Sequence, residues 1–136
     1  MARKKFHLKV ISPERIFYEG DAEMVELETT EGEIGVYAEH VPTTAVIVPG
    51  ILYITEEEEN VREAAVHDGF IEILQDRITI LAQSCEWPEE IDVKRAQEAK
   101  IRAERRINSG SSDVNLVRAE KALRKSLIRL QIATNK

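Results

Sequence analysis

The chain has 136 residues, of which 43% are hydrophobic and 5% aromatic, so it can form one domain, or one domain with an appendage, around a mainly aliphatic core. Its single cysteine, Cys85, excludes an internal disulfide, and its longest apolar stretch, residues 45–54, is too short to span a bilayer. The net charge of −6 is unevenly distributed: residues 89–136 carry 12 basic and 7 acidic side chains, whereas residues 1–88 carry 7 basic and 18 acidic ones. This polarity predicts two parts with different partners.

Residues 5–85 have the pattern of a β domain. Phe6, Leu8 and Val10 alternate with polar residues, which predicts a strand with one buried and one exposed face. More short β-rich runs follow, separated by turn signals, and the two glycines of "TTEGEIG" are expected to allow tight turns. Many short strands at close spacing predict a β-sandwich, or flattened barrel, that forms a docking domain over residues 1–87.

Two features of this β domain could carry metal or catalytic chemistry. Four consecutive glutamates, Glu56 to Glu59, could hold a metal, but adjacent side chains on a strand or turn point apart, so a solvated hairpin tip is the better interpretation. His40 and His67 lie far apart in sequence with no plausible nucleophile partner, which favours structural roles. We therefore expect no metal site and no catalytic site of the chain's own.

The pattern changes after Trp87-Pro88, where Ala, Glu, Lys and Arg replace the β-branched residues. A helix is predicted from residue 90, a linker over 108–113 and a second helix over 114–133; so short a connection predicts an antiparallel hairpin over residues 88–136. The expected apolar stripes are Ala96, Ala99, Ala103 and Ile107 in the first helix and Leu116, Ala119, Leu123, Leu127 and Leu130 in the second. Because alanine buries little apolar area, we expect a weakly held hairpin that can adopt two positions.

Basic side chains line one edge of the alanine stripe. On a helical wheel Arg95, Arg102 and Arg106 fall close together, and their guanidinium groups present planar donors that suit phosphate oxygens. The alternative is a solvated face with local ion pairs, such as Asp92 with Arg95 or Glu98 with Arg102. Spacing leaves both interpretations open, and in either case Asp92 is predicted to cap the first helix.

In this order and length, the motifs of the chain resemble those of the epsilon subunits of bacterial F-type ATP synthases. "FHLKVISPERIFYEG" resembles the family's opening strand and turn, and "GEIGVYAEHVP" resembles its signature G-x-x-G-[IV]-x-x-x-H-x-P. "GFIE" within "VHDGFIEIL" resembles a core strand, and "IDVKRA" resembles the nucleotide motif I/L-D-x-x-R-A. The chain departs from the family at Ala38-Glu39, where many members have Pro-Gly, and at Asp68, which replaces a glycine.

The resemblance implies both an architecture and a role. The implied fold is an N-terminal β-sandwich with a C-terminal helical hairpin. The sandwich is expected to bind the gamma subunit and rest on the c-ring, as a peripheral protein on the cytoplasmic face of the bacterial cell membrane. The hairpin is expected to permit ATP hydrolysis when folded and to block it when extended into the alpha/beta head.

The resemblance also implies ATP as a regulatory ligand of the folded hairpin, and it leaves open whether Mg²⁺ takes part. Since no phosphate-cradling glycine loop is present, binding would be sensory and not hydrolytic. At Lys125 the ATP-binding members have arginine, so the charge is kept but the bidentate fork is lost. The implied nucleotide-binding residues are Glu86, Ile91, Asp92, Arg95, Arg102 and Arg129.

Partner contacts are expected on both parts of the chain. Contacts with the c-ring are expected at Glu31, Glu33 and His40, and contacts with acidic segments of the head at Arg118, Lys121, Arg124 and Lys125. The alternative is a small β domain whose basic hairpin binds nucleic acid. Against that alternative stand the acidic body and the scarcity of aromatic residues for base stacking, so we expect no nucleic-acid partner.

Overall fold

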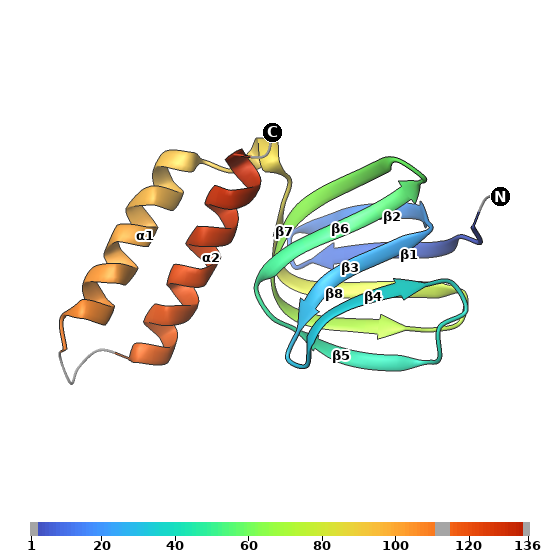
Figure 1. Cartoon of the computed structure of the whole chain (residues 1–136), viewed down its shortest axis with the longest axis horizontal. Coiled ribbons are helices and arrows are strands. Elements are labelled where there is room, and N and C mark those ends of the chain that lie inside the picture. The colour runs from blue at the N-terminus through green and yellow to red at the C-terminus, as the bar shows by residue number, and fades with distance from the viewer. Residues whose placement is uncertain (1–2, 111–114, 135–136) are drawn as a thin grey trace. The chain divides into compact units, whose positions relative to one another are not determined.

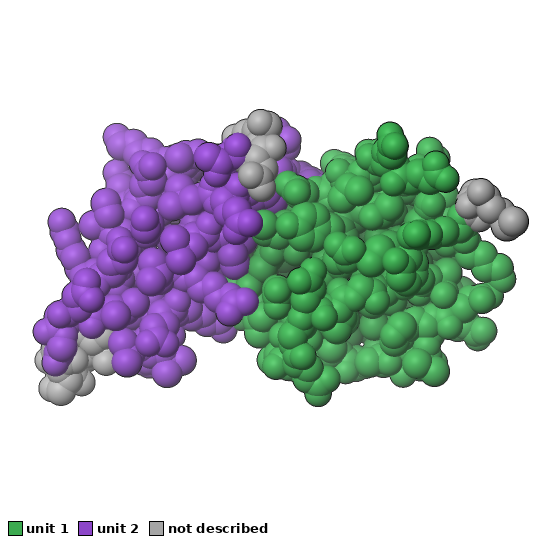
Figure 2. Space-filling view, in the orientation of Figure 1, with its two compact units in different colours: residues 1–85 green, residues 86–136 purple. Residues whose placement is uncertain are grey.

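The structure is a computed structural model that describes residues 3–110 and 115–134, and the chain divides into two compact units, residues 1–85 and 86–136 (Figures 1 and 2). The described part of the first unit, with the adjoining Glu86, forms eight strands. They are β1 (Phe6–Ser12), β2 (Arg15–Ala22), β3 (Met24–Thr29), β4 (Gly32–Tyr37), β5 (Thr43–Ile47), β6 (Gly50–Glu57), β7 (Asn60–Ile73) and β8 (Arg77–Glu86). The second unit contains the short 3-10 helix η1 (Pro88–Glu90), α1 (Val93–Asn108) and α2 (Leu116–Thr134).

The first unit is the predicted β-sandwich. One layer follows the order β2-β1-β8-β7-β5, in which β1 pairs antiparallel with β2 and parallel with β8. The other layer contains β4, β3 and β6, which lie in front of β1, β2 and β8 in Figure 1. The long strand β7 belongs to both layers, because it pairs with β6 over Asn60–Val66 and with β5 over Gly69–Ile73.

The core between the layers is aliphatic, as the composition predicted. Side chains such as Leu8, Val10, Leu52 and Ile80 are fully buried, and the alternation expected for β1 is confirmed. Burying each large aliphatic side chain stabilises the fold by about 1.5–3 kcal/mol. A slip of one residue would move these side chains to the exposed face and lose that stabilisation, so the alternation fixes the register of the strand. The hairpin tip expected at the glutamate run is also confirmed, because Glu57 pairs with Asn60 across the turn between β6 and β7.

Strand β7 changes layer at a bend whose backbone has an unusual conformation. Asp68 and Gly69 have φ angles of 52° and 143°. A Cβ atom on Gly69 would lie 1.8 Å from the carbonyl oxygen of Leu81, so β8 leaves no room for any side chain there. The bend therefore depends on glycine at position 69.

Two departures from the family motif fall at backbone positions that favour glycine. Asp68 and Glu39, which stand where the family has glycine, both have positive φ, at 52° and 66°. A non-glycine residue in this left-handed region costs roughly 1–2 kcal/mol. In the "TTEGEIG" segment Gly32 has a φ of 109° at the turn, whereas Gly35 lies inside β4, so the expectation of a turn at Gly35 was wrong.

Both helices begin at side-chain caps. Asp92 caps α1 as predicted, since its carboxylate accepts a hydrogen bond of 3.1 Å from the backbone N–H of Arg95. Asn115 does the same for α2, accepting a 3.1 Å hydrogen bond from the N–H of Arg118. The predicted linker lies partly outside the described residues, at 111–113. The two helices run antiparallel and pack against each other (Figure 1).

Small residues form part of the buried faces of the hairpin, and Ile128 and Ile132 of α2 are buried as well. Ala96 and Ala103 are buried in α1, and Ala119 and Ser126, with the same seven-residue spacing, are buried in α2. The predicted leucine stripe of α2 was partly wrong, because Leu116 and Leu127 are 50% and 46% exposed. The two exposed leucines lie about 60–100° around the helix from Ala119 and Ser126, and small side chains allow the closer approach of two helix axes.

Candidate functional site

The start of the hairpin is tied to its final turns by an ion pair. Arg129 on α2 donates from Nε to Glu86 Oε1 at 2.6 Å, and both side chains are about three-quarters buried. Next to this pair, the N–H of Trp87 donates to the Glu90 carboxylate at 2.9 Å, which holds η1 in place. Glu86 and Arg129 were both expected at a nucleotide site, and the structure brings these two together.

The motif residues lie directly after η1. Ile91 is buried, with 6% of its surface exposed, and Asp92 commits one carboxylate oxygen to the helix cap. Arg95 and Arg102 are exposed on α1, and neither forms an ion pair with a carboxylate in the described part of the chain. The local pairs Asp92–Arg95 and Glu98–Arg102 are therefore not formed through their side chains.

Basic residues occupy equivalent positions in the two helices. Each of four cations directly precedes a buried small residue, in the pairs Arg95-Ala96, Arg102-Ala103, Arg118-Ala119 and Lys125-Ser126. One residue is a rotation of about 100° about the helix axis. Because the helices are antiparallel and meet through the small residues, the same rotation places all four cations on one side of the hairpin. With Arg129, one turn beyond Lys125, these residues form what we call the basic face.

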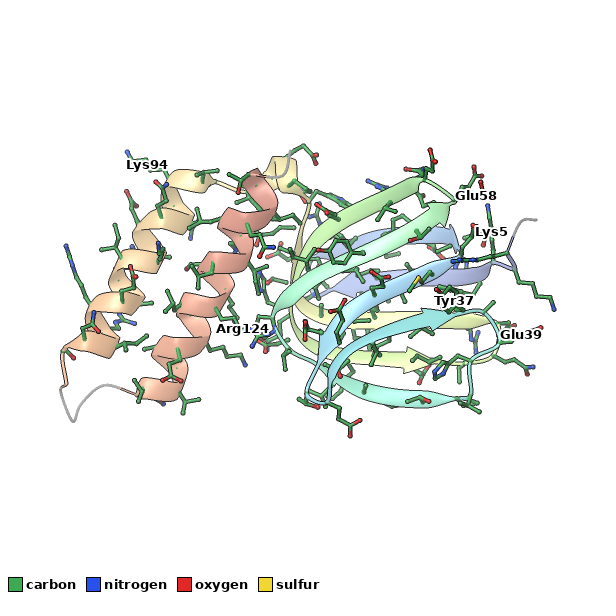
Figure 3. The ribbon with its side chains drawn as sticks, in the orientation of Figure 1. Lys5, Tyr37, Glu39, Glu58, Lys94 and Arg124 are labelled. Atoms are coloured by element: carbon green, nitrogen blue, oxygen red, sulfur yellow. The ribbon has the colours of Figure 1, made fainter. Side chains whose placement is uncertain are left out.

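The basic face has the chemistry of an anion site. Guanidinium groups bind phosphate oxygens in bidentate fashion, and Lys125 adds a point charge. Glu86 neutralises part of Arg129 through Nε, whereas Arg95 and Arg102 keep their full charge. Lys121 and Arg124, the other predicted head contacts, are exposed on α2; Lys121 lies one turn before Lys125 at the edge of the basic face, and Arg124 lies about 100° from Lys125 on a different side of the helix. In Figure 3 Lys94 projects outward from the start of α1.

The residues expected to contact the c-ring are spread along the first unit. Glu31 is exposed in the turn between β3 and β4, and Glu33 is exposed on β4. His40 lies in the loop after β4, where its Nδ1 is 2.7 Å from the carbonyl oxygen of Val41. Glu31 and His40 are thus separated by the whole length of β4, about 20 Å for six residues, and do not form one cluster.

Sequence reasoning missed an apolar band on the outer face of the first unit. Neighbouring strands place Val46 opposite Phe70, Leu81 opposite Ile11, and Ile11 opposite Ile16. Four of these side chains are strongly exposed: Ile16 by 55%, Val46 by 45%, Phe70 by 54% and Leu81 by 47%. We call these five residues the apolar band; it crosses β5, β7, β8, β1 and β2. An exposed patch of this kind marks a surface that binds a partner.

The sequence did contain a signal for this band. In each of these strands two apolar residues stand side by side, as in Ile16-Phe17, Val46-Ile47 and Phe70-Ile71. Since successive side chains of a strand point to opposite faces, one of each pair is buried and the other must face outward. Among the described residues, no group of three His, Cys, Asp or Glu side chains is placed to hold a metal ion, and no helix is long and apolar enough to cross a membrane.

The chain matches two sequence profiles of one family. The profile of the ATP synthase delta/epsilon chain β-sandwich domain matches residues 5–88, and that of the long alpha-helix domain matches residues 89–134. A protein named ATP synthase epsilon chain from Caldanaerobacter subterraneus is 45% identical over 132 residues, which cover 96% of this chain and 95% of that protein. The protein of the same name from Shouchella clausii is 42% identical over 130 residues, 95% of each chain.

Solved structures show the same fold. A chain in the Euglena gracilis mitochondrial ATP synthase superposes with a TM-score of 0.82 at 22% identity, covering 97% of this chain and 82% of that one. A chain in the central stalk and c-ring structure of the Tetrahymena thermophila mitochondrial ATP synthase superposes with a TM-score of 0.57 at 15% identity, covering 99% of this chain and 98% of that one. At these identities the likeness supports the fold alone.

Proposed function

The chain belongs to the delta/epsilon chain family of ATP synthases, and from this premise we propose that it is the central-stalk epsilon subunit of a bacterial F-type enzyme, with a hairpin that inhibits ATP hydrolysis. It would act as a non-catalytic rotor subunit, attached peripherally at the cytoplasmic face of the membrane through the other subunits. The basic face of the hairpin is the observation that carries this proposal. The family relationship over the whole chain does not favour the nucleic-acid alternative.

The first part of the proposal is that the first unit docks on the gamma subunit through the apolar band. Exposing such a surface to water is unfavourable for a free protein. Covering it with a partner stabilises the complex by about 25 cal/mol for each Å² of apolar area that is buried. Elsewhere on the unit, the exposed Glu31 and Glu33, in and after the β3–β4 turn, supply acidic groups for the c-ring.

Co-purification with the gamma subunit tests this docking surface. Phe70→Ser should reduce complex formation at least tenfold, because Phe70 is 54% exposed at the centre of the band and lies outside the buried core. Val61→Ser, a change of a similarly exposed residue (48%) outside the band, is the matched control. Equal gamma binding by both variants would place the interface elsewhere.

The second part is that the hairpin is a conformational inhibitor. On α1 its buried residues are the small Ala96 and Ala103, so α1 contributes little apolar area against opening, while α2 also buries Ile128 and Ile132. When extended, its basic side chains, Arg118, Lys121, Arg124 and Lys125 among them, can meet acidic segments of the alpha/beta head. Shifting such an equilibrium from 1:99 to 99:1 needs about 5.5 kcal/mol of differential interaction, which a few charge-assisted contacts supply. An enzyme assembled with a chain ending at Glu89 should hydrolyse ATP faster; an unchanged rate would refute the inhibitory role.

The third part is that ATP binds the basic face of the folded hairpin and stabilises it. Arg95 and Arg102 are exposed, have no carboxylate partner among the described residues and suit the phosphates, and Arg129, on the same face, is held by Glu86. Ile91 is the neighbouring apolar residue for the base and ribose, and Asp92 fixes the helix start. Calorimetric titration with ATP should give a Kd between about 1 μM and 1 mM, and Arg95→Ala should abolish the heat. Retained binding in this variant would remove the motif from the site.

A further inference from the structure

At one end of the sandwich, three segments that are distant in sequence enclose an acidic surface pocket of about 770 Å³. Its walls come from the residue before β1, from the junction of β2 and β3, and from the turn between β6 and β7. The lining residues are Lys5, Glu23, Glu57, Glu58, Glu59 and Asn60. In Figure 3 the labelled side chains of Lys5 and Glu58 lie at this end of the unit.

The backbone around the pocket is fixed by strand pairing. Ala22 pairs with Phe6 and Met24 pairs with Thr55, so Glu23 is held from both sides, and its own N–H donates to the carbonyl oxygen of Thr55 at 2.7 Å. The register of β6 against β7 shifts between Thr55 and Glu57, and such a bulge changes the direction of the side chains that follow it at the rim of the pocket. The pocket therefore lies on backbone that strand pairing holds around Glu23 and at both ends of the β6–β7 turn.

The pocket carries a strong negative charge. Four carboxylates face one ammonium group, which leaves three negative charges. The ammonium of Lys5 is 3.5 Å from Glu57 Oε1, whereas Glu58 and Glu59 form no ion pair with any described residue. A cation would be attracted to this end of the unit and held by several oxygens.

Glu23 is the unusual member of the set. Only 4% of its surface is exposed, yet its carboxylate makes no hydrogen bond or ion pair with any residue that the structure describes. Its carboxylate oxygens are not among the buried unpaired atoms, so they are open to the pocket that Glu23 lines, where a neutral glutamine would lack their charge. A buried carboxylate that lines a pocket is stabilised when a cationic group enters and pairs with it.

We propose that this pocket binds an arginine side chain, on a basic segment of a protein partner, through Glu23. The volume is far larger than a single ion needs, since even a water molecule occupies about 30 Å³. A guanidinium group is weakly hydrated and matches both oxygens of one carboxylate, so it is the cation best suited to a largely buried glutamate that lines a pocket. The exposed rim carboxylates, Glu57 to Glu59, would pair with basic residues that flank the arginine.

An NMR titration of the full chain tests this proposal. The probe is a capped peptide with one arginine between two lysines, and its matched control carries citrulline, which has the shape of arginine without the charge. The arginine peptide should shift the amide signals of residues 5, 22–24 and 57–60, with a Kd of about 1 mM or below. The citrulline peptide and the variant Glu23→Gln should each weaken binding about tenfold or more. Glu14→Gln, which removes the same charge from an exposed residue outside the pocket, should change it less than about twofold.

Thermal unfolding separates this role of Glu23 from a structural one. If the carboxylate has no partner in the free protein, Glu23→Gln should leave the melting temperature unchanged or raise it. A lower melting temperature would indicate a structural role and overturn the proposal. So would equal losses of binding in Glu23→Gln and Glu14→Gln, an absence of shifts with the arginine peptide, or a spermidine titration that gives the same shifts at equal affinity, since the last would indicate a polyamine site.

Discussion

Removing Arg129 should loosen the folded hairpin, because its ion pair with Glu86 joins the last turns of α2 to the segment that precedes η1. The two charged groups are 2.6 Å apart, and the side chains are 29% and 26% exposed. Fully exposed pairs contribute about 0.2–1 kcal/mol, whereas breaking a fully buried pair costs about 3–5 kcal/mol. For this partly buried pair we expect a coupling energy of about 1.5 kcal/mol.

Hydrogen exchange of the α2 amides measures this coupling, since local opening of the hairpin determines their exchange rates. Arg129→Gln should speed exchange about tenfold, because about 1.4 kcal/mol corresponds to a factor of ten. A double-mutant cycle with Glu86→Gln isolates the pair, and Arg105→Gln, an exposed arginine elsewhere in the hairpin, is the control. If Arg129→Gln had the same effect with and without Glu86, the ion pair would not be what holds α2.

Three further predictions concern the first unit. Glu39→Gly should raise the free energy of unfolding by about 0.5–1 kcal/mol in urea denaturation, because it relieves a φ of 66°; lower stability would mean that the surface ion pair with Lys4 outweighs the strain. Gly69→Ala should cost more than about 3 kcal/mol, since its Cβ would meet the Leu81 carbonyl oxygen, and unfolding at the wild-type midpoint would contradict this clash. Burial and the 2.8 Å hydrogen bond to Glu56 raise the pKa of Tyr18 to about 12. The phenol of Tyr18 loses its proton at lower pH in the unfolded state than in the folded state, so the free energy of unfolding should fall between about pH 10 and 12. Tyr18→Phe should make this decrease smaller, and an identical pH profile in the variant would refute the raised pKa.

The inner face of the sandwich could be predicted from the sequence because alternation decides it locally. Phe6, Leu8 and Val10 point into the core as expected. The apolar band on the outer face was not predicted, because Phe70 beside the buried Ile71 forms a continuous apolar run, and such a run does not indicate which of the two side chains faces outward. For the positive φ angles of Glu39 and Asp68 the signal was the glycine that the family has at each position, since glutamate or aspartate does not by itself indicate a left-handed backbone as glycine does.

The hairpin was predicted as a pair of helices, with the cap at Asp92, because these features depend on neighbouring residues. Which residues of α2 are buried depends instead on what packs against the helix, and the buried ones are Ala119, Ser126, Ile128 and Ile132. Spacing could not have paired Arg129 with Glu86, which lies 43 positions away. Nor could it have brought Glu23 into a pocket with the β6–β7 turn, because that arrangement arises only when three segments of the sheet meet.

The most direct test of the regulatory account is hydrogen exchange of the α2 amides with and without ATP, in the wild-type chain and in Arg95→Ala. If ATP binds only the folded hairpin, ATP at ten times its Kd should slow exchange about tenfold in the wild-type chain and leave the variant unchanged. Equal exchange rates with and without ATP in the wild-type chain would contradict the claim that nucleotide stabilises the folded hairpin.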